Sequence, residues 1–154
     1  MEKVDRTHWE RAELFEFFSA VSHPFYSVTF RVDVTNLYRY VKERHLSFYY
    51  AMGYLVTDAV NSVKNFRYAI RDGEVWLLDE RIPSLTDLKP GSEQFHIVTL
   101  PKVGGIAEFC ASAQARSAAQ KTLLDQDEEN DNLIYISCTP VSYTHLTLPT
   151  TPYV

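Results

Sequence analysis

The stretch "SFYYAMGYLVTDAVN" (residues 47–61) is the strongest helix signal in the chain. Apolar side chains recur at helical spacing and fall on one broad face, made by Phe48, Met52, Leu55, Val56, Ala59 and Val63. A helix with such a face is stable only when that face is buried against other secondary structure. The sequence on both sides of this helix therefore indicates what covers it.

The segments that follow predict strands and one more helix. "RYAIRDGEVWLLDE" (67–80) is typical of a hairpin, because Asp72-Gly73 tolerates the positive φ angles of a tight turn. Residues 84–88 and 93–99 are predicted strands separated by Pro90-Gly91. "IAEFCASAQARSAAQKTLL" (106–124) is predicted to be helical, "DQDEEND" (125–131) a solvated loop, and the apolar run "LIYISC" (133–138) a buried strand.

The segments that precede position 47 also alternate between helix and strand. Thr7 and Glu10 form a capping box that predicts a helix ending at "SHP" (22–24). "VTFRVDV" (28–34) alternates apolar and polar residues, as a strand with one wet face does, and Thr35 can cap another helix. The order of elements predicts a mixed α/β domain, with helices packed on a sheet.

Composition sets limits on the class of protein. The chain has 154 residues, 45% of them hydrophobic and 23% charged, as expected for one soluble domain. Neither a long apolar run nor a signal peptide is visible, and two cysteines indicate reduced thiols, so a cytoplasmic location is expected. A net charge of −5 argues against nucleic acid as a partner, because phosphate binding requires a basic face. The ten Tyr and nine Phe fit an aromatic core or an aromatic pocket for a flat small molecule.

Few residues carry a chemical signal by themselves. None of the five histidines has metal-ligand spacing, so no metal is expected, and His96 is predicted to be structural. "VGGIAEF" (103–109) is a weak phosphate signal, and a plain loop is the simpler interpretation. Ser137 ends a predicted strand, where a fixed hydroxyl can donate to an oxyanion. A buried serine bonded to the backbone is the alternative.

Several segments together resemble the chloramphenicol acetyltransferase family. The similar segments are "HWERAELFEFF", "VTFRVDVTNL", "SFYYAMGYLVTDAVN", "FRYAIRDGEVWLLDERIPSLT" and "NLIYISCTP", in the order that the family has them. Spacing is preserved to about residue 86 and the resemblance continues more loosely to Pro140. It implies a CoA-dependent acyltransferase fold with a mixed sheet, truncated at its C-terminus.

The resemblance also implies an activity and a set of site residues. The family transfers acetyl from acetyl-CoA to an alcohol, and a histidine of an H-H-x-x-x-D-G motif is the base. That motif is absent from this sequence, so the chain is expected to be inactive and poorly stable by itself. The family is trimeric, with each site shared between neighbouring subunits, so a homotrimer is expected. The implied residues are Ser137 for the oxyanion, Phe17, Phe18, Thr86 and Phe95 for the acceptor, and Arg11 as the structural partner of the motif's Asp.

The last segment differs from the rest of the chain. No Asp, Glu, Lys or Arg follows Asp131, and "VSYTHLTLPTT" looks like a translated sequencing adapter. We therefore expect residues 1–140 to be the N-terminal part of the acetyltransferase-like domain and residues 141–154 to be a non-native tail. His145 lies in this tail and is not expected to be the catalytic base.

Three other interpretations remain open at the level of sequence. Phe18 stands where the family usually has Tyr, which favours an acyltransferase with a different acceptor. The aromatic residues also suit a non-catalytic module that binds a small molecule. The third interpretation is a fragment with no function of its own.

Overall fold

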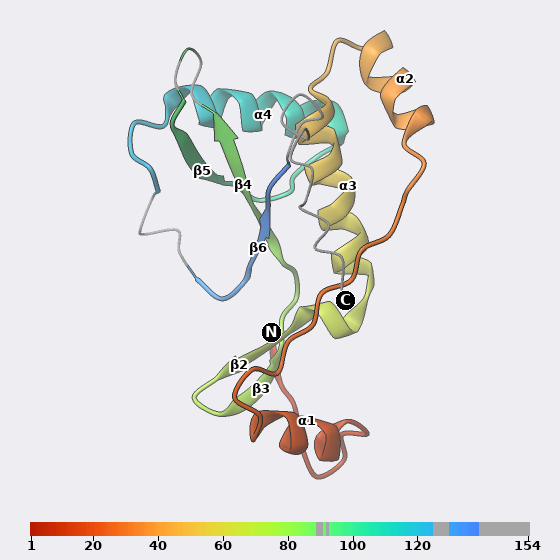
Figure 1. The fold of residues 1–154 in the computed structure, drawn as a ribbon, viewed down its shortest axis with the longest axis vertical. Coiled ribbons are helices and arrows are strands. Elements are labelled where there is room, and N and C mark those ends of the chain that lie inside the picture. Colours follow the sequence, from red (N-terminus) through yellow and green to blue (C-terminus); the bar gives the residue numbers. More distant parts are fainter. Residues whose placement is uncertain (89–90, 92, 125–129, 139–154) are drawn as a thin grey trace, which may run out of the picture.

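The computed structural model describes residues 1–88, 91, 93–124 and 130–138. The chain combines helices with strands that form two small sheets, which confirms the mixed α/β prediction (Figure 1). The elements are β1 (Glu2–Lys3), α1 (Ala12–Ser19), α2 (Thr35–Glu43), α3 (Phe48–Ser62), the 3₁₀ helix η1 (Lys64–Arg67), β2 (Tyr68–Arg71), β3 (Glu74–Leu77), β4 (Ile82–Leu88), β5 (Phe95–Thr99), α4 (Ile106–Ala119) and β6 (Leu133–Ile136).

The strands form two small sheets. The first has the order β1-β3-β2 and is antiparallel, and its β2–β3 turn has positive φ at Asp72 (51°) and Gly73 (77°), as the sequence predicts. The second has the order β5-β4-β6, in which β5 is antiparallel to β4 and β6 is parallel to it. The predicted strands at 84–88 and 93–99 are therefore confirmed, and β4 is the central strand of the second sheet.

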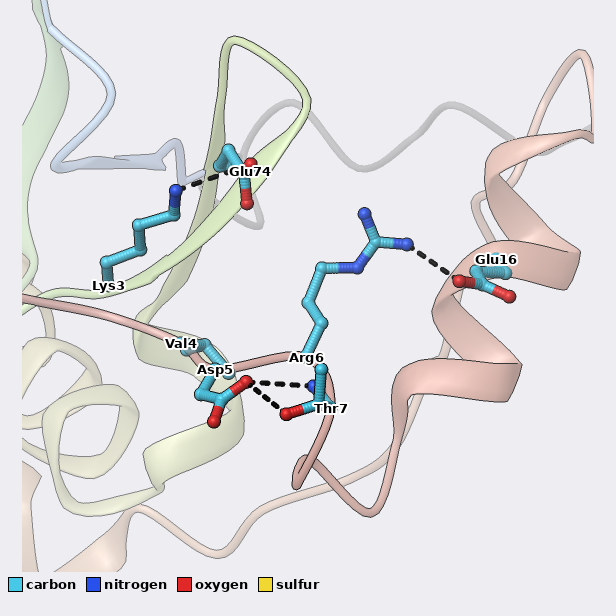
Figure 2. Close-up of a pocket in the computed structure, with 7 residues that line it drawn as sticks. All are labelled: Lys3, Val4, Asp5, Arg6, Thr7, Glu16 and Glu74. Carbon is cyan, nitrogen blue, oxygen red and sulfur yellow. Dashed lines mark hydrogen bonds and ion pairs between the residues drawn. The ribbon is translucent and has the colours of Figure 1, made fainter.

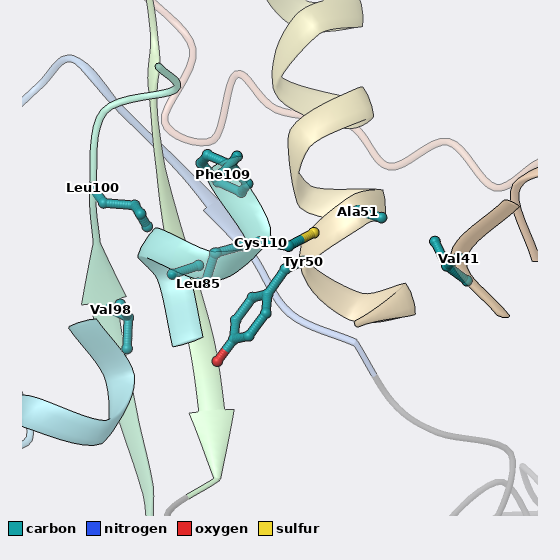
Figure 3. Packing of buried hydrophobic residues seen from close by; sticks show 9 residues of the cluster. Val41, Tyr50, Ala51, Leu85, Val98, Leu100, Phe109 and Cys110 are labelled. Atoms are coloured by element: carbon teal, nitrogen blue, oxygen red, sulfur yellow. The ribbon is translucent and has the colours of Figure 1, made fainter. Parts of the chain in front are cut away.

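The core lies where α2, α3 and α4 meet the second sheet (Figure 3). Phe109 is 1% exposed and packs edge-on against Tyr54, with 5.6 Å between ring centroids. Each fully buried side chain of this size stabilises the fold by about 1.5–3 kcal/mol relative to an exposed one. The cluster consists of Val41, Tyr50, Ala51, Leu85, Val98, Leu100, Phe109, Cys110 and Ala113.

The helix α3 has its predicted extent but buries a different face. Ser47 caps its start, since the Ser47 hydroxyl accepts from the Tyr50 amide at 3.3 Å. The buried residues are Tyr50, Ala51, Gly53 and Thr57, whereas Phe48 and Leu55 of the predicted face are each 37% exposed. Small residues decide the orientation, because a Cβ at Gly53 would lie 2.9 Å from Leu85 Cδ2 on β4. Close helix–strand approach thus outweighs the wider apolar stripe.

Arg81 links the two sheets through backbone carbonyls. Its guanidinium donates to the carbonyl oxygens of Phe66 (2.9 Å), Tyr68 (2.5 Å) and Asp131 (2.5 Å). These carbonyls precede β2, begin β2 and precede β6, so a single side chain ties the hairpin to the second sheet. Burial lowers the pKa of Arg81, and the three acceptors compensate for the lost hydration of its charge.

Two predictions about the N-terminal region are wrong. The helix α1 begins at Ala12, and Thr7 does not cap it, because the Thr7 hydroxyl and amide both donate to Asp5 Oδ1 (2.7 and 3.0 Å). Residues 28–34 form no strand. Among the described residues none pairs with this segment, and Phe30 is 76% exposed, so the alternating pattern lacks the neighbour that a strand requires.

Three other predictions need smaller corrections. The helix α4 ends at Ala119 rather than residue 124, because Gln120 leaves the helix and donates to Ile97 O (2.6 Å). The strand β6 lies at the edge of its sheet, so Leu133 is buried but Tyr135 is 67% exposed. Thr35 is the first residue of α2 rather than its cap, and its amide is satisfied by Asp33 Oδ1 at 2.9 Å.

The Gly104-Gly105 loop is a helix start, as the simpler interpretation predicts. Gly104 has φ +69°, and Glu108 Oε2 accepts from the Gly105 amide at 2.9 Å. A carboxylate therefore occupies the position at which a phosphate would meet this helix N-terminus. Of the acidic segment 125–131, only Asn130 and Asp131 lie within the described residues.

Asp131 makes a pH-dependent contribution to stability. Arg71 Nε and Nη2 donate to its two carboxylate oxygens (2.5 and 2.6 Å), and these hydrogen bonds lower the pKa of Asp131. This stabilisation is complete above the ordinary aspartate pKa of about 3.9 and is lost as the pH falls through the lowered folded value.

We therefore expect Asp131→Asn to lower the urea midpoint of unfolding at pH 7, and this difference to shrink as the pH falls through the lowered pKa of Asp131. Asp72→Asn is a suitable control, since Asp72 is an exposed aspartate in the hairpin turn next to Arg71. A difference between Asp131→Asn and the parent protein that stayed constant across this pH range would contradict the assignment.

Candidate functional site

The sequence-predicted residues Thr86 and Ser137 lie at the carboxyl ends of neighbouring parallel strands. The β4–β6 register pairs Leu85 with Ile136, so Thr86 and Ser137 are the next residues along the two strands. Both strands run toward the end of the molecule that α4 covers (Figure 1). Thr86 is half-buried and Ser137 is exposed, so the Ser137 side chain is open to a ligand. The expected alternative of a buried structural serine does not fit this exposure.

Phe95 lies close to the same strand end. It begins β5 and pairs with Leu88, two residues beyond Thr86 on β4. Its side chain is 50% exposed. The structure thus brings three of the predicted site residues, Thr86, Phe95 and Ser137, to one end of the second sheet.

Tyr49 contacts both β4 and β6 at the ends where Thr86 and Ser137 lie. Its hydroxyl lies 2.5 Å from the carbonyl oxygen of Thr86 and 3.3 Å from that of Ile136. Burial is the main cause that raises the pKa of Tyr49, and electrostatic interactions with the nearby Cys138 and Asp87 raise this pKa further. The phenol is therefore protonated over the whole physiological range and acts as a hydrogen-bond donor.

A second tyrosine begins a buried chain of polar groups. Tyr50 donates to Asp87 Oδ2, and the Ser117 hydroxyl donates to the same oxygen at 2.6 Å. Burial, followed by the bond to Asp87, raises the pKa of Tyr50 to about 12. His96 Nε2 lies 2.8 Å from Ser117 Oγ, so the chain connects α3, β4, α4 and β5.

The geometry of this chain indicates a structural role for His96. Because Ser117 donates its proton to Asp87, its oxygen accepts from the Nε2–H of His96. His96 is 1% exposed, and its Nδ1 has no partner among the described residues. A histidine held this way lacks access to substrate, which agrees with the prediction that His96 is structural.

The site residues predicted from the sequence do not include Tyr49, Tyr50, Asp87 or Ser117. All four are polar residues in segments predicted as ordinary helix or strand. The one available signal is the pair Tyr49-Tyr50 in the first turn of α3, since two adjacent tyrosines at a buried helix start require partners for their hydroxyls.

Three predicted site residues lie elsewhere. Phe17 and Phe18 project from α1, are 66% and 50% exposed, and contact each other edge-on at 5.2 Å. Arg11 is the half-buried residue that precedes α1. Figure 1 shows α1 beside the β2–β3 hairpin, at the end of the molecule opposite α4. The structure does not bring these residues to the strand ends, and their implied roles stay predictions.

A hollow of about 700 Å³ near the N-terminus does not have the chemistry of a site (Figure 2). Its charged side chains neutralise one another: Lys3 pairs with Glu74 (3.3 Å) and Arg6 with Glu16 (2.9 Å). The Asp5 carboxylate is occupied by Thr7 and His8, whose hydrogen bonds lower its pKa. Its lining comes from the N-terminal segment, α1 and β3, none of which reaches the end of β4.

The described residues contain neither a metal-binding cluster nor a membrane-spanning helix. Within those residues, no group of three His, Cys, Asp or Glu side chains could hold a metal ion. None of the described helices is long and apolar enough to cross a bilayer. His145 lies outside the described residues.

Comparison with known proteins identifies the family to which this fold belongs. A solved structure described as a chloramphenicol acetyltransferase superposes with a TM-score of 0.76 and 26% sequence identity, covering 91% of this chain and 70% of that one. The sequence model of the chloramphenicol acetyltransferase family matches residues 1–152. The chain belongs to this family, and the resemblance seen in the sequence is confirmed.

Relatives from several bacteria give the extent of the match. Chloramphenicol acetyltransferase 3 of Escherichia coli is 30% identical over 141 residues, which is 90% of this chain and 66% of that protein. The chloramphenicol acetyltransferases of Clostridium perfringens and Clostridioides difficile are each 39% identical over 95 residues, which is 44% and 43% of those proteins. The chain thus spans between 43% and 66% of the length of these three relatives.

Proposed function

We propose that this chain is part of an acetyl-CoA-dependent O-acetyltransferase that acts on chloramphenicol or a similar hydroxylated small molecule. Family membership supports the class of reaction. The observation that carries the proposal is the position of Ser137, an exposed hydroxyl at the end of a strand, next to Thr86 in the sheet. Phe95 adds an exposed aromatic ring at the same end for a flat acceptor.

In the proposed reaction the acceptor hydroxyl oxygen attacks the carbonyl carbon of the acetyl thioester. A base removes the hydroxyl proton, and the carbonyl oxygen becomes an oxyanion. Ser137 donates a hydrogen bond to this oxyanion, which is worth about 2.7–4 kcal/mol when the donor is fixed in place. The intermediate then collapses, the C–S bond breaks, and the CoA thiolate leaves and takes up a proton.

The base is proposed to be a histidine that this chain does not contain. The family's H-H-x-x-x-D-G motif has no counterpart in the 154 residues. General-base assistance contributes about 10²–10⁴-fold to such a reaction, so we propose that the chain by itself is inactive. A homotrimer, in which the histidine of one subunit meets the Ser137 of its neighbour, is proposed from family resemblance. Free Cys110 and Cys138 support a cytoplasmic location.

The function is tested with a full-length protein, which continues this sequence to the length of its relatives and carries H-H-x-x-x-D-G. We expect CoA release, detected as free thiol, when acetyl-CoA and chloramphenicol are both present. The 154-residue chain is the matched control and is expected to release none above the uncatalysed rate. No thiol release by the full-length protein over a panel of hydroxylated acceptors would refute the proposal.

The acceptor is a separate part of the proposal. Phe18 replaces the tyrosine that is usual in the family, which favours an acceptor that does not need this hydroxyl. The panel therefore includes alcohols related to chloramphenicol, and the acceptor with the highest kcat/KM identifies the substrate. We also propose that residues 141–154 are a non-native tail, and an independent DNA read across codon 140 tests this directly.

A further inference from the structure

Ser137 begins just where the regular pairing of β6 ends. The last paired residue of β6 is Ile136, and β6 is an edge strand with one described neighbour, β4. Beyond Ile136 no ladder partner is described, so the sheet alone does not fix the backbone of Ser137. Oxyanion stabilisation depends on a donor held to within about 0.5 Å, so another contact has to orient this residue.

Tyr49 makes a contact of this kind. Its hydroxyl lies 3.3 Å from the Ile136 carbonyl oxygen and 2.5 Å from the Thr86 carbonyl oxygen. The Ile136 carbonyl belongs to the same planar peptide unit as the Ser137 amide nitrogen. A group that holds this oxygen therefore restricts the rotation of the peptide plane from which Ser137 extends.

The phenol is well placed to hold both strands in one register. Tyr49 lies in the first turn of α3, whose start is fixed by the Ser47 cap. The next residue, Tyr50, is bound to Asp87, the residue after Thr86. The two adjacent tyrosines thus contact consecutive residues of β4, Tyr49 at the Thr86 carbonyl and Tyr50 at the Asp87 carboxylate. Only Tyr49 of the two also reaches β6.

We infer that Tyr49 is a positioning residue for the acetyl-transfer site, acting through the carbonyls of Thr86 and Ile136 to hold Ser137 in place. This inference rests on the proposed function of Ser137. It assigns a part in catalysis to a side chain that does not touch substrate. It also explains why a tyrosine, rather than a phenylalanine of similar volume, occupies this half-buried position.

The first test uses the chain as it stands, with Cys138 as the reporter. Cys138 is a free, exposed thiol adjacent to Ser137, while Cys110 is buried and serves as an internal reference. We expect Tyr49→Phe to raise the rate of maleimide labelling at Cys138 several-fold and to leave Cys110 unlabelled. Tyr54→Phe is the matched control, because Tyr54 lies on the same helix as Tyr49 and its hydroxyl also donates to a backbone carbonyl, that of Gly104 at 3.1 Å. Equal labelling rates in both variants and the parent would overturn the inference.

The second test uses the full-length protein and separates positioning from mere stability. Loss of one hydrogen bond costs about 0.5–1.5 kcal/mol, so both tyrosine variants are expected to fold with similar small decreases in Tm. We expect Tyr49→Phe to lower kcat by about 10-fold to 10²-fold with little change in KM, since a displaced catalytic group affects the transition state. Tyr54→Phe is expected to keep the parent kcat.

A double-mutant cycle distinguishes failure of this inference from failure of the proposed function. If Tyr49 acts through Ser137, Tyr49→Phe has almost no further effect on kcat in a Ser137→Ala background. Equal kcat losses in the two backgrounds would overturn the inference while leaving the role of Ser137 intact. A Ser137→Ala variant with unchanged kcat would instead refute the proposed function of Ser137.

Discussion

Replacing Ser137 with alanine is expected to lower kcat of the full-length protein by about 10²–10³-fold, with KM for both substrates little changed. The reason is that the serine hydroxyl stabilises charge that exists only in the transition state. Because Ser137 is exposed and follows the last paired residue of β6, its removal leaves no cavity in the core. The melting temperature is therefore expected to stay within a degree or two of the parent value.

The matched control is Ser112→Ala, since Ser112 is an exposed serine on α4. Initial rates at several concentrations of each substrate give kcat and KM, and differential scanning calorimetry gives Tm. A purely structural serine would show the reverse result, with a lower Tm and a normal kcat measured below the transition. That outcome would remove the central residue from the proposed site.

The second large effect is expected in the core. Phe109→Ala removes a side chain that is 1% exposed and packed against Tyr54 and its neighbours in the cluster. Substitutions of this kind lower the free energy of unfolding by about 3–5 kcal/mol. Domains have a total stability of only about 5–15 kcal/mol, so this loss is a large fraction of the total and the urea midpoint should fall markedly.

Phe66→Ala is the control for this prediction, because Phe66 is 57% exposed. It is expected to change the free energy of unfolding by no more than about 0.5 kcal/mol. Urea unfolding followed by circular dichroism measures both variants in the 154-residue chain. Similar losses in the two variants would mean that the α3–α4–β4 cluster is not the core of this protein.

Local patterns were sufficient to predict the β2–β3 hairpin, much of the second sheet and two of the helices that cover it. The Asp72-Gly73 turn, the strands β4 and β5, and the helices α3 and α4 follow from turn chemistry and periodicity, which act within a few residues. The buried face of α3 could not be predicted in this way. It depends on how closely Gly53 approaches Leu85, a contact between residues 32 positions apart in the sequence.

The segment 28–34 shows the limit of pattern reasoning most clearly. Its alternation is typical of a strand, but a strand forms only beside a neighbouring strand, and none of the described strands pairs with this segment. Likewise, Ser137 could be singled out by its place after an apolar run, and Thr86 and Phe95 by family resemblance. Tyr49 could not, because its role follows from two carbonyls that the fold brings to one hydroxyl.

The most direct test of the acetyltransferase assignment is to follow the acetyl group itself. The full-length protein is incubated with acetyl-CoA labelled in the acetyl carbons and with chloramphenicol, and the products are separated and identified by mass spectrometry. We expect labelled O-acetyl chloramphenicol, or the labelled ester of another alcohol in the panel, formed in proportion to free CoA. A folded full-length protein that forms no labelled ester with any of these acceptors would contradict it.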